Sequence, residues 1–194
     1  MLGVFLGMTA ANLMFLSAVF VLGLLPDRAA SAVAGSHHVA MAIFAGLLAT
    51  LVHMVTFTYF MATTSWLAAA TEKQDLDRAR FVRYAARQKQ RVFLMCMTAV
   101  AATMLAMFSG AGADLAVTFG WSSQVHLAAG ATALLVNGLC AAGQYHHVRA
   151  RGRMMDDALA ILNGPALVAR QARPAQAKYR NHEVRPPVGL RRTT

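Results

Sequence analysis

Two histidines are the residues of this chain best suited to holding a cofactor. His38 and His126 each lie at the start of a long apolar stretch. Haem b in a membrane bundle requires two imidazoles from different helices that face each other across the porphyrin at one depth. His38 and His126 meet these requirements of depth and helical phase, so we consider them as haem b ligands. Two histidines at a membrane interface can equally be solvated or bonded to loop carbonyls.

A second group of polar residues is expected deeper within the apolar stretches. Asn12, His53 and Asn137 lie at similar distances from one end of their stretches, and Thr98 or Thr103 adds a hydroxyl from the remaining one. Polar side chains in hydrocarbon are costly and usually face a bundle interior. We therefore predict a buried polar layer in which His53 pairs with Asn137. The ordinary interpretation is a hydrogen-bond cluster that fixes packing, and the alternative is a proton, quinone or ligand site.

The helical phase of the polar residues supports this inward orientation. On the second apolar stretch, four polar residues fall within about 60° of one direction at ~100° per residue, namely Thr50, His53, Thr56 and Thr64. On the fourth stretch, three fall within about 20°, namely His126, Asn137 and Gln144. Both polar stripes are expected to face other helices.

The residues needed for several common membrane chemistries are missing from the apolar stretches. None of the stretches contains Asp or Glu, which argues against a proton pump, a metalloprotease and a di-iron protein. No Ser/His/Asp set assembles at one depth, so the sequence identifies no enzyme. Cys96 and Cys140 are interpreted as small apolar packing residues, because thiols near the cytoplasm are kept reduced.

Composition and the length of the apolar stretches predict a membrane protein. The chain has 194 residues, of which 57% are hydrophobic and 13% charged, whereas a soluble domain carries about 25% charged residues. Uncharged apolar stretches of ~18 or more residues predict membrane spans. A soluble enzyme, a secreted disulfide scaffold and a disordered chain are excluded. The predicted spans are residues 2–25, 38–62, 92–110 and 124–146.

The placement of positive charge predicts the topology. The net charge is +10, and 17 of the 18 Lys and Arg residues fall within 72–91 or 149–192. By the positive-inside rule these segments are cytoplasmic, where they face a bilayer leaflet of anionic lipid. The links 26–37 and 111–123 are then external, and both termini are internal. No aromatic interleaving or known module accompanies the charge, so nucleic-acid binding is not expected.

One alternative concerns the first span. Ala30-Ser31-Ala32 resembles a signal-peptidase site, so residues 1–32 could be a cleaved signal peptide. The segment has no positive n-region, however, and its apolar run exceeds the ~7–15 residues of a signal-peptide core. We therefore expect a retained span.

The predicted fold is an all-α, antiparallel four-helix transmembrane bundle over residues 1–147, with a long cytoplasmic helical hairpin. Asp75 or Asp77 can cap a helix that continues into the third span. Residues 148–165 are expected to form a juxtamembrane amphipathic helix that ends at Asn163-Gly164-Pro165. The basic tail 166–194 is rich in Arg, Pro and Gln and is expected to be disordered.

Several stretches resemble a group of small four-span bacterial membrane proteins without established activity. They read LVHMVTFTYFMATTSWL, RVFLMCMTAVAATMLAMFSGAGAD, VHLAAGATALLVNG and YHHVRARGRMMDDA. The resemblance covers roughly residues 40–160 and implies a four-span fold in the bacterial inner membrane. It carries over no catalytic residue.

These features favour a non-catalytic accessory or assembly subunit of a larger membrane complex, with other membrane subunits as partners. A second hypothesis is a haem b or quinone-interacting electron-transfer protein that uses His38 and His126. A third is a small transporter or channel, which would have to be oligomeric because four helices enclose little lumen.

Overall fold

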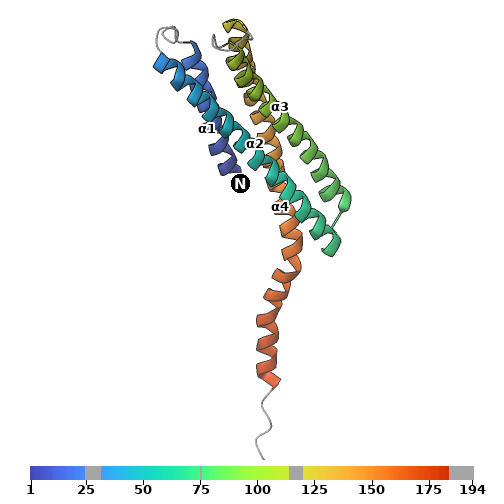
Figure 1. Cartoon of the computed structure of the whole chain (residues 1–194). Coiled ribbons are helices and arrows are strands. Elements are labelled where there is room, and N and C mark those ends of the chain that lie inside the picture. Colours follow the sequence, from blue (N-terminus) through green and yellow to red (C-terminus); the bar gives the residue numbers. More distant parts are fainter. Residues whose placement is uncertain (25–31, 75, 114–119, 184–194) are drawn as a thin grey trace, which may run out of the picture. The chain divides into compact units, whose positions relative to one another are not determined.

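The computed structural model of the protein is helical throughout the long segments it describes, which are residues 1–24, 32–74, 76–113 and 120–183. Four of its helices are long and apolar enough to cross a membrane, as the sequence predicts. Figure 1 labels the four long helices, α1 (Leu2–Leu24), α2 (Ala32–Gln74), α3 (Tyr84–Ala113) and α4 (Ser123–Glu183). A short π-helix, η2 (Ala79–Arg83), comes directly before α3 in the chain.

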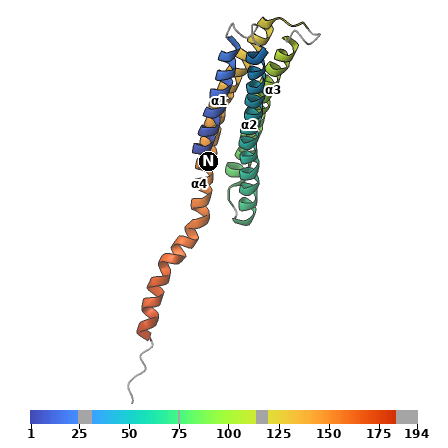
Figure 2. The same cartoon turned by 60° about the vertical axis from the view of Figure 1, so that its left-hand side comes forward.

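The chain divides into two compact units, Met1–Met155 and Asp156–Thr194. Within the first unit, α2 and α3 lie side by side in both views (Figures 1 and 2). The helix α1 packs along α2, where the rings of Phe15 and Phe44 approach to 5.1 Å between centroids. The described part of the second unit continues α4 to Glu183.

Asp77 begins the helix that leads into the third apolar segment. Its Oδ1 accepts hydrogen bonds from the backbone N–H groups of Ala79 at 2.8 Å and Arg80 at 3.2 Å. The first N–H groups of a helix have no partner within the helix, and an Asp side chain at the N-cap satisfies them. The short π-helix η2 then leads directly into α3. The long helix predicted to continue into the third span is therefore confirmed, whereas Asp75 lies outside the described residues.

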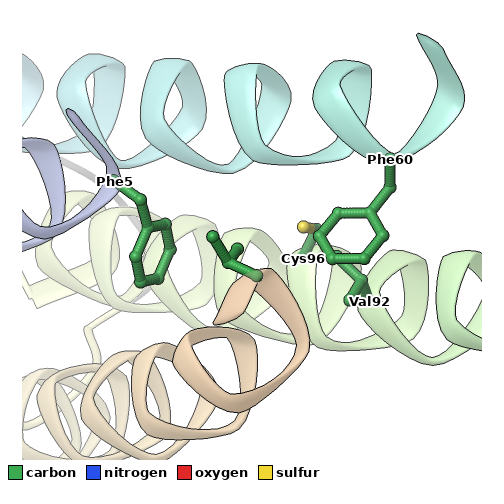
Figure 3. Packing of buried hydrophobic residues seen from close by; sticks show 5 residues of the cluster. Phe5, Phe60, Val92 and Cys96 are labelled. Atoms are coloured by element: carbon green, nitrogen blue, oxygen red, sulfur yellow. The ribbon is translucent and has the colours of Figure 1, made fainter. Parts of the chain in front are cut away.

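All four long helices contribute to one apolar cluster, shown in Figure 3. Phe60 of α2 points toward Val92 and Cys96 of α3, and all three side chains are buried. Phe5 of α1 and Val148 of α4 complete the cluster. Burying such side chains stabilises a soluble fold through the hydrophobic effect, but between helices in lipid the gain comes from close packing.

The main departure from the predicted fold is in α4. The sequence predicts a helix end at Asn163-Gly164-Pro165 and disorder over residues 166–194, whereas α4 extends from Ser123 to Glu183 without interruption. A proline removes one backbone donor and can bend a helix without ending it. Residues 166–183 are also rich in Ala, Arg and Gln, which are favourable helix formers. Residues 184–194 lie outside the described part of the chain, as do Ala30 and Ser31 of the signal-peptidase-like site.

Candidate functional site: a buried polar network

His53 of α2 lies at the centre of a hydrogen-bond network that joins three helices. Its Nε2 is 3.1 Å from Oδ1 of Asn137, and its Nδ1 is 3.2 Å from Nε2 of Gln144, both on α4. The three side chains are 3%, 1% and 1% exposed. The direct contact predicted between His53 and Asn137 is present, and Gln144 faces inward as its helical phase predicts.

The amide of Asn137 has a defined orientation because its nitrogen has several acceptors. Nδ2 donates to the carbonyl oxygen of Ala133 at 2.8 Å and to Oγ1 of Thr103 at 3.0 Å. Thr103 in turn donates to the carbonyl oxygen of Ala99 at 2.9 Å. With Nδ2 donating, Oδ1 of Asn137 must accept, so Nε2 of His53 carries the proton. Nδ1 of His53 then accepts from Gln144, and the imidazole is neutral.

Cys96 ties α3 into the same network. Its thiol donates to the carbonyl oxygen of His53 at 3.4 Å, and its sulfur accepts from Nε2 of Gln144 at 3.4 Å. Within the described residues, no group of three or more His, Cys, Asp and Glu side chains could hold a metal ion. The arrangement is thus a set of directional bonds between helices, and both ring nitrogens of His53 take part in it.

Asn12 does not join this network, although the sequence places it at the same depth. It is only 2% exposed, so the predicted burial is correct. Its Oδ1, however, has no hydrogen-bond partner among the described residues. A single residue such as Asn12 forms no polar stripe on α1 from which the rotation of that helix against its neighbours could be predicted. The hydrogen-bonded layer therefore contains His53, Thr103 and Asn137 from three helices.

The second predicted pair, His38 and His126, is also brought together. Their ring centroids are 6.2 Å apart, with an angle of 84° between the ring planes. Metal–imidazole nitrogen bonds are about 2 Å long, so two rings on opposite sides of one metal ion have centroids roughly 6 Å apart. The separation of the two rings is therefore compatible with a bis-histidine ligand pair. The same separation and angle also describe a direct edge-to-face contact of two rings.

Ser109 orients the ring of His126 through a hydrogen bond to Nδ1. Oγ of Ser109 donates to the carbonyl oxygen of Ala106 at 2.8 Å and lies 3.1 Å from Nδ1 of His126. When the serine proton is directed at Ala106, Nδ1 of His126 donates to Oγ and Nε2 is the ring nitrogen without a proton. Gly110 allows this close approach, since a Cβ there would lie 2.9 Å from Cε1 of His126. A hydrogen bond to the other ring nitrogen is typical of metal-ligating histidines.

Arg151 of α4 is a buried residue that the sequence pattern does not reveal. It is 0% exposed and donates to three neutral acceptors, namely Gln88 Oε1 at 3.1 Å, Thr64 Oγ1 at 3.1 Å and the carbonyl oxygen of Ala85 at 2.8 Å. Its Cζ lies 4.9 Å from the ring centroid of Phe60. Within the sequence it is one positive charge in a basic run. The signal that could have found it is its position seven residues after Gln144, on the same helix face.

These three sites have a common order along the helices. The three sites follow α2 in the order His38, His53 and Thr64. At these sites the residue numbers on α4 increase, from His126 through Asn137 to Arg151, whereas those on α3 decrease, from Ser109 through Cys96 to Gln88. Each site therefore joins the same three helices at a different level. No protein-family model matches this chain, and neither a curated protein nor a solved structure does so.

Proposed function

We propose that the protein is a multi-pass protein of the bacterial inner membrane with both termini and the α2–α3 hairpin in the cytoplasm. Four apolar helices support the membrane assignment, and the placement of 17 of 18 positive charges in two segments supports the orientation. The alternating order of contacts along α2, α3 and α4 supports an antiparallel bundle. The anionic lipid of the cytoplasmic leaflet then faces the basic segments.

Within that membrane, the protein acts as a non-catalytic accessory or assembly subunit of a larger complex. The observation that carries this proposal is that the side chains of the polar layer bond to one another. His53, Asn137 and Gln144 direct their polar atoms at each other and at side chains of α3. A substrate site or proton relay requires groups that face a cavity or a water path. A layer that pairs internally instead supports a rigid scaffold of three helices.

The helix α1 supplies the surface that such a scaffold would offer to other subunits. Only 11% of the residues in an apolar 18-residue stretch of α1 are buried, against 33% in the corresponding stretch of α2. Helices associate in membranes through packing of exposed faces and a few hydrogen bonds. The weakly covered α1 therefore suits contact with a neighbouring membrane subunit as well as with lipid.

The test is purification of the tagged full-length chain from its native membrane in a mild detergent. We expect it to elute with the same membrane proteins in constant ratio, identified by mass spectrometry, across several detergents. Deleting the gene should lower the amount of that complex without abolishing the catalytic activity of the remaining assembled complexes. Elution as a single chain in every mild detergent would contradict the proposal.

A haem b electron-transfer protein is the second candidate, and it is favoured by the pairing of His38 with His126. When bound, haem would supply one-electron transfer. His38 and His126 would hold it, and Ser109 would orient the ring of His126. Protein from haem-replete cells should then show a sharp b-type spectrum on reduction, lost in His38→Ala and His126→Ala and retained in the exposed control His146→Ala. A colourless preparation would end this candidate.

A further inference from the structure

Four arginines follow one exposed face of the helix formed by η2 and the first turns of α3. They are Arg80, Arg83, Arg87 and Arg91, and we call this set the arginine stripe. Tyr84, 47% exposed, lies in the same row. The spacing of three, four and four residues keeps one face of a helix in register.

The opposite face of this segment is fixed by packing, so the stripe has a defined direction. Phe81, Ala85, Gln88 and Val92 are between 0% and 3% exposed. Gln88 and the carbonyl oxygen of Ala85 are bonded to Arg151 of α4. Rotation of the helix would break these contacts. Arg80, Arg83 and Arg87 are therefore held on the exposed side of the helix, whereas Arg91 lies close enough to His147 of α4 to interact with it electrostatically.

The positive charge of Arg83, Arg87 and Arg91 is not balanced within the described parts of the protein. No ion pair to a carboxylate is formed there by Arg83, Arg87 or Arg91, and residues 78–113 contain no Asp or Glu. The nearest acidic side chain in sequence, Asp77, accepts backbone N–H groups at the helix start. A guanidinium group binds carboxylates through paired hydrogen bonds, so the stripe suits an acidic partner.

The direction of the stripe distinguishes between kinds of partner. Arg91 adjoins the apolar segment that begins at residue 92. At ~1.5 Å per residue, Arg80 lies about 16 Å further along the helix axis than Arg91. A lipid surface can reach the Arg91 end, but a stripe that runs away from the membrane leaves the Arg80 end beyond the headgroups. An acidic helix lying alongside can reach the whole row.

We propose that the arginine stripe binds an acidic helical segment of a partner protein, an inference that rests on the proposed cytoplasmic placement and accessory role. The partner helix would carry Glu or Asp every three to four residues on one face. Arg and Tyr are the residue types enriched among interface residues that carry most binding energy. Complementary charge also speeds association and selects the partner.

The experiment uses the full-length chain in phosphatidylcholine nanodiscs and a fluorescent helical peptide with Glu at three- to four-residue spacing on one face. A second peptide of the same composition has its glutamates scrambled. The test variant is Arg83→Gln/Arg87→Gln/Arg91→Gln. Its matched control removes three exposed charges elsewhere, Lys73→Gln/Arg149→Gln/Arg153→Gln.

We expect the patterned peptide to bind about ten-fold more tightly than the scrambled one. The stripe variant should lose about ten-fold in affinity, which corresponds to ~1.4 kcal/mol, and the control should lose less than about two-fold. Both variants should keep the thermal midpoint of the wild type, because the substituted side chains are exposed. Equal binding of the two peptides, or equal loss in both variants, would overturn the proposal in favour of net charge alone. Stronger competition by phosphatidylglycerol vesicles or by a single-stranded RNA 12-mer would overturn it in favour of lipid or nucleic acid.

This binding assay is independent of the orientation in the membrane, which a reporter fused after Ala70 measures separately. If the peptide binds but the reporter lies on the external side of the membrane, the proposed topology is contradicted and the peptide-binding role of the arginine stripe is retained. A cytoplasmic reporter without peptide binding would reject the arginine stripe and leave the topology standing.

Discussion

Nε of Arg151 donates to Oε1 of Gln88 across 3.1 Å, so that a charged side chain of α4 is held by an uncharged one of α3. Nε2 of Gln88 is itself buried and has no hydrogen-bond partner among the described residues. A buried charge depends on its acceptors, because their removal leaves the charge desolvated and unpaired. Gln88 is therefore a sensitive point in the packing of α4 against α3.

Replacing Gln88 should test this dependence in both directions. Gln88→Leu removes the acceptor of Arg151 and is expected to lower the free energy of unfolding by ~1–3 kcal/mol. Gln88→Glu replaces the unpartnered amide nitrogen by oxygen and is expected to raise the thermal midpoint, since hydrogen bonds between charged groups are the stronger ones. The exposed Gln90→Leu is the control. Thermal unfolding in detergent measures all three, and a Gln88→Leu protein as stable as Gln90→Leu would contradict the prediction.

The contact between His53 and Asn137 predicts coupled effects on stability. His53→Ala and Asn137→Ala should each cost ~1 kcal/mol, and the double variant should cost less than their sum, because contacting residues couple. The control is Thr132→Ala, whose exposed hydroxyl bonds only to the carbonyl oxygen of Ala128 in its own helix. Strictly additive losses would show that the pair does not interact. Loss of a biological function with unchanged stability would instead indicate a ligand or proton site.

Gly110 should tolerate no side chain, whereas Gly138 should accept one. A Cβ at Gly110 would lie 2.9 Å from Cε1 of His126, and one at Gly138 would meet nothing within 4 Å. Gly110→Ala is therefore expected to displace His126 from Ser109 and to lower the thermal midpoint. Gly138→Ala should be neutral or slightly stabilising, because Ala favours helix over Gly by ~1 kcal/mol. Equal midpoints for the two variants would show that the ring of His126 moves aside freely.

Reporter fusions should reveal the orientation of the four spans. Fusions after Ala70 and after Arg153 are expected to report the cytoplasm, because the segments around them carry most of the positive charge. Fusions within 27–36 or 111–120 should report the exterior. A periplasmic signal from a fusion at the C-terminus would overturn the proposed topology.

Much of the inner polar layer could be predicted from sequence because a helix has a fixed period. Aligned polar residues on α2 and α4 indicated that His53, Asn137 and Gln144 face inward, and all three are buried. Depth counted from the ends of the spans was sufficient to pair His53 with Asn137. It was not sufficient for Asn12, which is buried but whose Oδ1 has no partner among the described residues, because equal depth does not determine which side chains meet.

The burial of Arg151 was missed for a different reason. A positive charge after the last span satisfies the positive-inside rule wherever its side chain points, and Arg149 and Arg153 on either side are indeed exposed. The acceptors of Arg151 are a carbonyl, a hydroxyl and an amide, and none of these gives a charge pattern that a sequence would reveal. Extending the inward face of α4 by two helical turns beyond Gln144 would have identified it.

The equal spacing of Asn137, Gln144 and Arg151 has a geometric consequence for the whole scaffold. A seam that repeats every seven residues drifts by about 20° per repeat on a straight α-helix. Over the two repeats from Asn137 to Arg151 this drift amounts to about 40°, so all three residues stay on one side of α4, facing α2 and α3. One residue inserted between Asn137 and Arg151 would rotate these two side chains by about 100° relative to each other. The helix could then keep the contact of Asn137 with His53 or the hydrogen bonds of Arg151, but not both.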